Sequence, residues 1–418
     1  MSAPLNILQI SPRVPWPVAD GATIGIYNIT RSVAARGHRI TFAAFGKTGT
    51  DSGSSSDAND MPSFCRLEII AHDTSNSVWK ALRNLPSHEP YPISKYHSAA
   101  MTARIDALCE EERFDIVHVD HAHMAMYGEY VQRRFGIPYV LREHNFETTI
   151  YRRYAERMRL PVLSHYFRMQ AARMYKYESS VLTHPDVIAA ITPEDAVDIR
   201  TALGTQGGAA RRSAKENIRI IPAGVDVKRM RPFNTEPNSA HVVVVGPLVW
   251  APNIDAATWF ATEIWPRIKA AVPEARCTIA GASPPRRLLR LATEDLRIPG
   301  FVDDYAELLS SATVMAVPLR IGGGMRVKLL EFFACGKAVV STAIGAEGNA
   351  ARDGEQYISA DSAGDFAAAV VAIIRNPELR RSIGLAARTL AKQTYSWDHI
   401  GELFEKAYLE AVALRSGS

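Results

Sequence analysis

A glycine-rich turn followed by charged residues is the stretch of the sequence whose spacing best suits chemistry. Gly322–Gly324 precede a predicted helix that ends at Gly336, and Lys328 and Glu331 lie three residues apart on it. Backbone N–H groups at the positive end of a helix dipole bind anions. Residues three apart share one helix face, so both side chains can reach one ligand. The pattern predicts a nucleoside diphosphate site, with Lys328 at the phosphates and Glu331 at the ribose hydroxyls.

An ordinary solvated helix face is the alternative for this Lys–Glu pair. Lys328 in the first turn opposes the helix dipole, however, and Lys before Glu is the weaker order of pairing. Because the local helix energetics disfavour Lys328 at this position, a functional role is favoured over a solvated face. Arg326 lies two residues before Lys328, about 200° around a regular helix, so it faces the same ligand only if it precedes the first regular turn.

Two polar clusters follow short apolar runs in the first half of the chain, at His118–His123 and Arg142–Glu147. The carboxyl ends of parallel strands are where open α/β sheets bind ligands. His118 alternates into its strand and is predicted to be a core histidine. For each of the others a capping or loop role remains open, but two clusters at neighbouring strand ends favour a site. The candidates are Asp120, His121, Glu143, His144 and Asn145.

The elements that must position these residues are short strands alternating with helices. Such alternation predicts βαβ units and parallel sheets, an α/β fold class. The first helix is predicted to end at Arg36, with Gly37 as its C-cap. The predicted strands of the first half are Leu5–Ile10, Arg39–Phe45, Leu67–Ile70, Ile116–Val119, Tyr139–Leu141 and Val187–Ile191.

The same rhythm restarts after Gly204–Asn217, a polar, glycine-rich run typical of a domain boundary. A helix is predicted from about Asp255 to Ala271, and the last helix after Ser396. Two doubly wound halves favour a ligand cleft between them. The polar run Gly46–Pro62 is predicted to be a mobile surface loop. The predicted strands of the second half are Val242–Val245, Cys277–Ala280, Val314–Pro318 and Ala338–Ser341.

Composition excludes several classes of protein. A length of 418 residues predicts about two to three domains. A net charge of +4 argues against nucleic acid as the main partner. The four cysteines are scattered without metal-ligand spacing, which favours a reduced, cytoplasmic protein. The N-terminus lacks the features of a signal peptide, and no apolar run approaches the ~18 residues of a membrane span, so a soluble protein is predicted.

Rival enzyme motifs are absent from the sequence. No predicted strand is followed by GxGxxG, which argues against an NAD enzyme. The motif GxSxG is also absent, which argues against a serine hydrolase. Asp303-Asp304 is more simply a helix N-cap than a metal site.

The segment Tyr151–Tyr177 is basic and rich in aromatic residues. It has seven basic residues against one acidic residue, a net charge of +6. Contact with an anionic membrane surface fits better than nucleic acid, although a solvated face remains an alternative.

Seven motifs together resemble the retaining nucleotide-sugar glycosyltransferases of family four (group 1 type), which have the two-domain GT-B fold. The resemblance covers nearly the whole chain. It implies an acceptor-binding domain at 1–205, a donor-binding domain at 206–396, and a C-terminal helix at 397–418 that packs back on the first domain. The motifs are Asp20-Gly21 with the helix ending Arg36-Gly37-His38, Ile221–Asp226, Val245–Asn253, Ile298–Asp303, Gly322–Gly336, Ser341–Gly348 and Tyr395–Asp398.

The resemblance and the residue patterns together assign the site. The expected donor contacts are Gly322, Gly323, Gly324, Met325, Glu331, Gly246, Pro299 and Val302. The expected catalytic residues are Lys328, Arg326, Glu331, His121 and Asp120. The expected acceptor-side residues are Gly21, Glu143, His144 and Asn145.

The chain departs from the family pattern at two places. The family has two glutamates eight positions apart; the second is Glu331 here, but the first position is Gly323. Because that first glutamate usually contacts the transferred sugar, the identity of the sugar is left open. The usual Arg and Lys after the first strand of the second domain are also missing, and Arg326 and Lys328 are expected to supply that charge.

The resemblance implies transfer, with retention and without a metal or other cofactor, from a nucleotide-diphospho-sugar to a glycan, lipid-linked or small-molecule acceptor. Bacterial cell-surface polysaccharide or glycoconjugate synthesis is the expected setting, at the inner face of the membrane. A nucleotide-sugar epimerase of the same fold and a catalytically weak sugar-nucleotide-binding protein are the alternatives.

Overall fold

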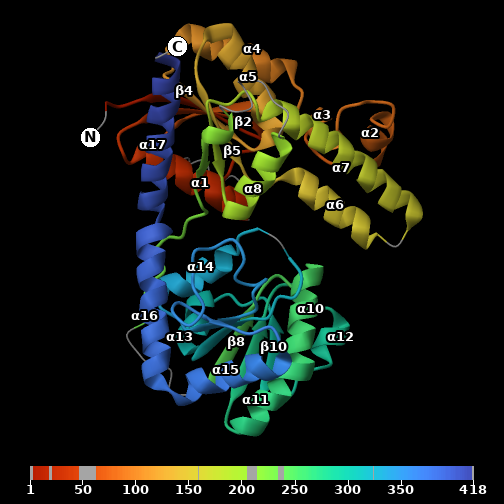
Figure 1. Cartoon of the computed structure of the whole chain (residues 1–418), viewed down its shortest axis with the longest axis vertical. Coiled ribbons are helices and arrows are strands. Elements are labelled where there is room, and N and C mark those ends of the chain that lie inside the picture. Colours follow the sequence, from red (N-terminus) through yellow and green to blue (C-terminus); the bar gives the residue numbers. More distant parts are fainter. Residues whose placement is uncertain are drawn as a thin grey trace. The chain divides into compact units, whose positions relative to one another are not determined.

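The computed structural model describes residues 3–17, 21–46, 63–158, 160–204, 214–233, 240–322 and 324–416. The predicted mobile loop and most of the predicted glycine-rich boundary therefore lie outside the described residues. The chain divides into two compact units (Figure 1): the first is Met1–Pro222 with Ile400–Ser418, and the second is Ala223–His399. The first unit extends past the predicted boundary at residue 205 because residues 218–220 form the last strand of its sheet.

The first unit contains a seven-stranded parallel sheet with the order β3-β2-β1-β4-β5-β6-β7. Helices lie on both faces of the sheet (Figure 1), which explains why its central strands read as continuous apolar runs. The strands are β1 (Asn6–Ser11), β2 (Arg39–Gly46), β3 (Arg66–Ala71), β4 (Ile116–Asp120), β5 (Tyr139–Glu143), β6 (Val187–Ala190) and β7 (Ile218–Ile220). The helices are α1 (Gly21–Ala34), α2 (Val78–Arg83), α3 (Tyr91–Ser94), α4 (Ala99–Glu111), η1 (Ala122–Met124), α5 (Ala125–Phe135), α6 (Glu147–Arg157), α7 (Pro161–Val181) and α8 (Pro193–Ala202).

The second unit repeats this topology in a six-stranded parallel sheet, with the order β10-β9-β8-β11-β12-β13. The strands are β8 (His241–Val245), β9 (Arg276–Ala280), β10 (Leu296–Gly300), β11 (Val314–Val317), β12 (Val339–Ser341) and β13 (Ile358–Ser359). The helices are α10 (Ala251–Trp259), η2 (Phe260–Ile264), α11 (Trp265–Ala271), α12 (Arg286–Leu289), α13 (Tyr305–Ser311), α14 (Val327–Ala334), α15 (Ala363–Arg375) and α16 (Pro377–Thr394).

Each sheet has one position where the strand order reverses. In the first sheet it lies between β1 and β4, and in the second between β8 and β11. Open α/β sheets bind ligands beside the carboxyl ends of the strands at such a switch point. The topology therefore directs attention to the residues that follow these four strands.

Two predicted elements differ in detail from the structure. The helix expected from about Asp255 begins at Ala251, where Pro252 suits the first turn. It continues to Ala271 through a π-helical stretch, η2, directly before α11. Pro266 explains the irregularity, because proline has no N–H to donate within a regular helix.

The last helix, α17 (Trp397–Ser416), is anchored in the first unit by its residues from Ile400 onward. Arg36 Nε donates to Glu405 at 2.6 Å, and the Tyr408 hydroxyl lies 2.5 Å from His118 Nδ1. Gly401 packs so closely on α1 that a Cβ there would lie 3.2 Å from the Ser32 backbone. None of the described helices combines the length and apolar character of a membrane span.

Candidate functional site

One face of helix α14 packs against the interior of the second unit, and the opposite face carries its charged residues. Leu329, Leu330, Phe332 and Phe333 are buried against the interior of the second unit, whereas Lys328 and Glu331 are not. This confirms the predicted helix and the shared face of its two charged residues. Gly336, at a φ of +66°, follows the helix in the left-handed region that favours glycine.

The Lys328 and Glu331 side chains meet around a third residue, Tyr305, the first residue of α13. The Tyr305 hydroxyl donates to Glu331 Oε2 at 3.0 Å. Lys328 Nζ lies 3.4 Å from the same oxygen and 4.6 Å from the centre of the Tyr305 ring. Burial, reinforced by Glu331, raises the pKa of Tyr305, so its hydroxyl stays a donor. Sequence reasoning missed Tyr305, because 26 residues separate it from Glu331.

Arg326 precedes the first regular turn of α14, as a shared ligand with Lys328 requires. It occupies the N-cap position with an extended backbone, at φ −90° and ψ 91°. Its guanidinium lies over Gly322, where a Cβ would approach Nη2 to 1.8 Å. Gly324 has a φ of +74°, whereas Gly323 lies outside the described residues. The two described glycines thus serve close packing and a left-handed turn.

The strand ends around α14 bring the other expected donor residues to the same edge of the sheet. Gly246 follows β8, and its N–H donates to Ala280 O at 3.0 Å. The approach of the next strand is closer still, since a Cβ on Gly281 would lie 1.8 Å from Gly246 O. Pro299 is exposed at the end of β10, and Val302 packs between that strand and α13 with the interior cluster.

A cation at a strand end that the sequence prediction overlooked is Arg320, three residues after β11. Its guanidinium makes two hydrogen bonds to Asp255, of 3.0 and 2.7 Å, and lies 5.0 Å from the Trp259 ring centre. These contacts tie the loop that leads to Gly322 onto α10. In the sequence, only its position just before the Gly322–Gly324 run pointed to a role for Arg320.

In the first unit, Asp120 belongs to the interior. Its side chain is 0% exposed and accepts from Gln9 at 2.7 Å, with His118 Nε2 at 3.2 Å and Arg142 at 3.6 Å. Burial alone would raise the pKa of Asp120, but His118, Arg142 and Gln9 hold it at about 2. Asp120 is therefore corrected from a substrate contact to a buried anchor, and His118 is confirmed as a core histidine.

Glu143 requires the same correction. It is the last residue of β5, 1% exposed, and burial, with Glu178 and Glu147 nearby, raises the pKa of its carboxyl well above the usual range. The protonated form is the one such an environment favours, and an acceptor in solvent cannot reach it.

The residues that emerge from these two strand ends are histidines. His121 and His144 each follow the buried acid of their strand, and their rings lie 4.6 Å apart. His121 has a φ of 68°, and its N–H donates to Arg142 O at 2.9 Å. The ring centre of His123 lies 6.0 Å from that of His121. The structure therefore brings three imidazoles together at the predicted edge.

Their surroundings keep these imidazoles neutral. Burial, assisted by the neighbouring cations and imidazoles, lowers the pKa of His121 well below its usual range, that of His144 to about 3 and that of His123 to about 4. A neutral imidazole has one donor and one acceptor nitrogen, which suits a hydroxyl group. Asn145 follows His144 before α6, and Gly21 begins α1 with open space around its Cα.

We expect His144 to make the first unit less stable in acid. Its pKa is 6.5 in the unfolded chain and about 3 in the folded protein, so between these values the unfolded chain binds the extra proton. The stability that neutral His144 contributes is present above pH 6.5 and is lost as the pH falls. Thermal unfolding from pH 7 to pH 4.5 should show a smaller decrease in Tm for His144→Gln than for the wild type. An equal or larger decrease would contradict the assignment.

No group of three His, Cys, Asp or Glu side chains among the described residues is placed to hold a metal ion. That the reaction proceeds without a metal stays a prediction from the sequence.

Comparison with protein families decides the identity of the fold. Residues 19–229 match the model described as Glycosyltransferase Family 4, and residues 239–376 match the model described as Glycosyl transferases group 1. The chain belongs to glycosyltransferase family 4. Its two Rossmann-like parallel-sheet units form the GT-B fold, as the sequence predicts.

Similar proteins of known activity are distant. A GDP-mannose-dependent monoacylated alpha-(1-6)-phosphatidylinositol monomannoside mannosyltransferase of Corynebacterium glutamicum is 27% identical over 203 residues, which is 44% of this chain and 53% of that protein. The match thus spans about half the length of that relative. A D-inositol 3-phosphate glycosyltransferase of Acidothermus cellulolyticus is 24% identical and covers 95% of this chain and 87% of that protein.

Solved structures extend the fold comparison over the whole chain. Sucrose-phosphate synthase from Thermosynechococcus elongatus superposes with a TM-score of 0.68 at 17% identity, covering 98% of this chain and 100% of that one. HepE from Anabaena in complex with UDP gives 0.64 at 13% identity, covering 96% and 99%. These likenesses show the fold alone.

Proposed function

We propose that this glycosyltransferase moves a sugar, with retention of configuration, from a nucleotide-diphospho-sugar to a hydroxyl-bearing acceptor. The observation that carries the proposal is the arrangement on α14, where an exposed lysine and a partly exposed glutamate share one face of the helix that follows a glycine-rich segment. Cation and carboxylate at a helix start match the two parts of a nucleoside diphosphate, the phosphates and the ribose.

The donor is held by the second unit in this account. The diphosphate is bound by the backbone amides of Gly322–Gly324 and by the side chains of Arg326 and Lys328. Glu331 accepts hydrogen bonds from the ribose hydroxyls. As the bond between the sugar C1 and the phosphate oxygen breaks, negative charge grows on the diphosphate. Fixed donors and cations stabilise that charge best in the transition state, so we propose a metal-independent reaction.

The acceptor binds the first unit, beside His121, His144, Asn145 and Gly21. Neutral His121 donates a hydrogen bond from its imidazole N–H to the acceptor oxygen, which holds that oxygen in place and leaves the hydroxyl proton free to move. Asp120 and Glu143 are both buried, so neither supplies an exposed nucleophile. We therefore propose that the acceptor oxygen bonds to C1 on the face that the diphosphate leaves, and that its proton passes to the departing phosphate oxygen.

The acceptor we favour is lipid-linked, because one end of the first unit suits a membrane surface. Helices α6 and α7 form a hairpin that extends away from the sheet (Figure 1). Near its turn Leu160 is 63% and Val162 81% exposed, and Arg152, Arg153 and Arg168 are exposed on the same hairpin. The net charge of +6 over this segment complements anionic lipid.

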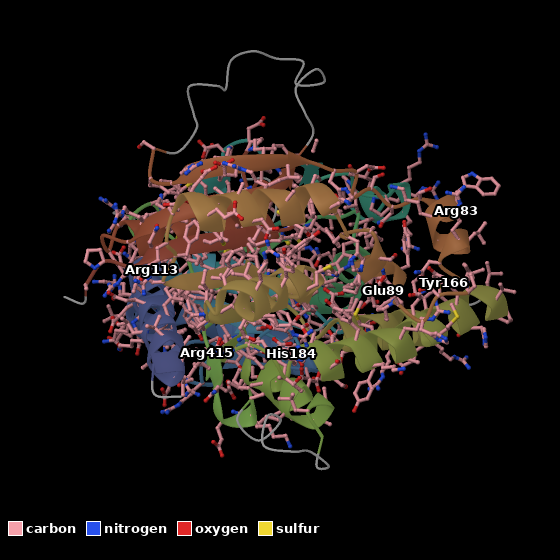
Figure 2. The ribbon with its side chains drawn as sticks, turned by 90° about the horizontal axis from the view of Figure 1, so that it is seen from above. Arg83, Glu89, Arg113, Tyr166, His184 and Arg415 are labelled. Carbon is pink, nitrogen blue, oxygen red and sulfur yellow. The ribbon has the colours of Figure 1, made fainter. Side chains whose placement is uncertain are left out.

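Helix α2 adds a second apolar face at the same end of the unit. None of its residues is buried, and Val78, Trp79 and Leu82 lie three and four apart on one side. Arg173 of α7 donates to Leu85 O at 2.7 Å and so fixes the end of α2 to the hairpin. Figure 2 shows Arg83 of α2 and Tyr166 of α7 at the same side of the view. An exposed Trp among cations is typical of a membrane-interface contact. We propose that α2 and the hairpin rest on anionic lipid at the inner face of the membrane.

Co-sedimentation with vesicles tests this contact. We expect binding to increase with the content of anionic lipid and to weaken at high salt, since each Lys or Arg near the surface contributes about 1 kcal/mol. Trp79→Glu and Val162→Glu should each reduce binding. Leu385→Glu, which changes an exposed leucine of the second unit, should not. Equal sedimentation with neutral and anionic vesicles would contradict a membrane role.

A donor screen tests the function itself. Thermal unfolding of the full chain with UDP-, GDP- and ADP-sugars should identify at least one donor that raises Tm, because a ligand that binds only the folded state stabilises it. Incubation with that donor alone should release nucleoside diphosphate slowly. Conversion to a different nucleotide sugar would instead favour an epimerase, and binding without any turnover would favour a non-catalytic module.

A further inference from the structure

The Tyr305 side chain contacts both charged groups of the donor site, and it does so through different parts of its structure. Its hydroxyl donates to Glu331 Oε2 at 3.0 Å, whereas its ring face lies 4.6 Å from Lys328 Nζ. The two contacts can therefore be removed separately. The tyrosine is itself fixed at the start of α13, since Asp304 caps this helix by accepting from Glu307 N at 2.7 Å.

The hydrogen bonds to Glu331 are unevenly divided between its two oxygens. Oε2 receives both the Tyr305 hydroxyl and the Lys328 ammonium. Within the part of the chain that the structure describes, Oε1 accepts no hydrogen bond, and the side chain is 20% exposed. One carboxylate oxygen is thus held by the protein, and the other is available to a ligand. A carboxylate oxygen has two lone pairs, so Oε1 can accept from two neighbouring hydroxyls.

We propose that Tyr305 is a positioning residue of the donor site, which turns Glu331 Oε1 toward the ribose and holds Lys328 over its ring for the diphosphate. The inference rests on the proposed function and deepens it. The hydroxyl governs recognition of the ribose, and the ring governs the location of the cation. Tyr305 then contributes to the preference for ribonucleotides over deoxyribonucleotides without touching the nucleotide.

The test separates the two contacts with two substitutions. Tyr305→Phe removes the hydroxyl and keeps the ring beneath Lys328, whereas Tyr305→Leu removes both. Affinities for UDP, GDP and ADP and for their 2′-deoxy counterparts are measured by calorimetry, using the nucleotide that binds the wild type. The wild type should prefer the ribonucleotide by about tenfold or more, since a hydroxyl–carboxylate hydrogen bond is lost with the 2′-deoxy form.

We expect Tyr305→Phe to reduce that preference by about threefold to tenfold, and to lower kcat for the cognate donor less than Tyr305→Leu does. Tyr305→Leu should also lower kcat, by about tenfold, because Lys328 loses its ring contact. Tyr357→Phe removes a phenol hydroxyl elsewhere in the same unit and should leave the preference unchanged. A purely structural Tyr305 would lower Tm but leave the ratio of ribonucleotide to deoxyribonucleotide affinity untouched.

Two further outcomes distinguish this inference from the proposed function. If Glu331→Gln removes the ribose preference while Tyr305→Phe retains it in full, Tyr305 does not position the carboxylate. If Glu331→Gln itself leaves the preference unchanged, the proposed donor site fails, and the role of Tyr305 fails with it.

Discussion

Lys328→Ala is expected to lower kcat by about 10²–10³-fold, the range seen when a fixed donor to a developing oxyanion is removed. Lys328 Nζ is held by Glu331 Oε2 and by the Tyr305 ring, so the cation is already located before a donor binds. Charge on the diphosphate oxygens grows as the bond to the sugar breaks. The loss should therefore fall on kcat more than on KM.

Arg326→Ala should lower kcat less. The Arg326 guanidinium lies over Gly322 and packs the turn, so part of its role is to shape the loop. Steady-state kinetics of both variants with the cognate donor make the comparison. Lys392→Ala, which removes an exposed lysine from α16 of the same unit, is the matched control. Wild-type turnover in Lys328→Ala together with an inactive Arg326→Ala would show that the functional cation lies before the helix rather than on it.

Glu331→Gln should weaken nucleotide binding by at least about tenfold while the protein stays folded. The amide keeps the shape of the side chain but loses the charge-assisted hydrogen bonds, each worth about 1.5–3 kcal/mol. The substitution also removes the charge that faces Lys328 and the preferred acceptor for the Tyr305 hydroxyl. Both changes should act on binding rather than on the chemical step.

Calorimetric titration with the nucleoside diphosphate that binds the wild type gives the comparison directly. Glu274→Gln, at an exposed position of the same unit, controls for a general effect of removing one negative charge. Unchanged affinity of Glu331→Gln for every nucleoside diphosphate that binds the wild type would remove this residue from the site.

Much of the fold follows from patterns within single segments. Continuous apolar runs located β1, β2, β4 and β8 to within about one residue, because central strands of a parallel sheet are buried on both faces. The apolar face of α14 was also predictable, since its apolar residues recur with the helical period. The strands that sequence reasoning did not identify are β7, β10 and β13. They are edge or near-edge strands, and their partly exposed or alternating residues resemble loops.

The geometry of the candidate site was predictable where one segment carries it and not where several segments meet. Lys328 and Glu331 share a helix, so their spacing was sufficient. Tyr305 reaches Glu331 only because α13 packs beside α14, and the spacing of residues along the sequence does not indicate that contact.

Asp120 and Glu143 show the converse error. Both lie at strand ends as expected, but every residue of β4 and β5 is buried, because helices cover both faces of the sheet. The histidines that follow, His121 and His144, are therefore the ones whose rings meet at the edge.

Real-time NMR of the cognate donor with the protein, in the absence of acceptor, tests the central claim most directly. Water then replaces the acceptor hydroxyl, and the protein should release nucleoside diphosphate together with free sugar. The account predicts that the sugar first appears with the anomeric configuration that it had in the donor and only later mutarotates. Initial release of the opposite anomer would contradict retention, and a bound donor that never releases its nucleotide would contradict glycosyl transfer.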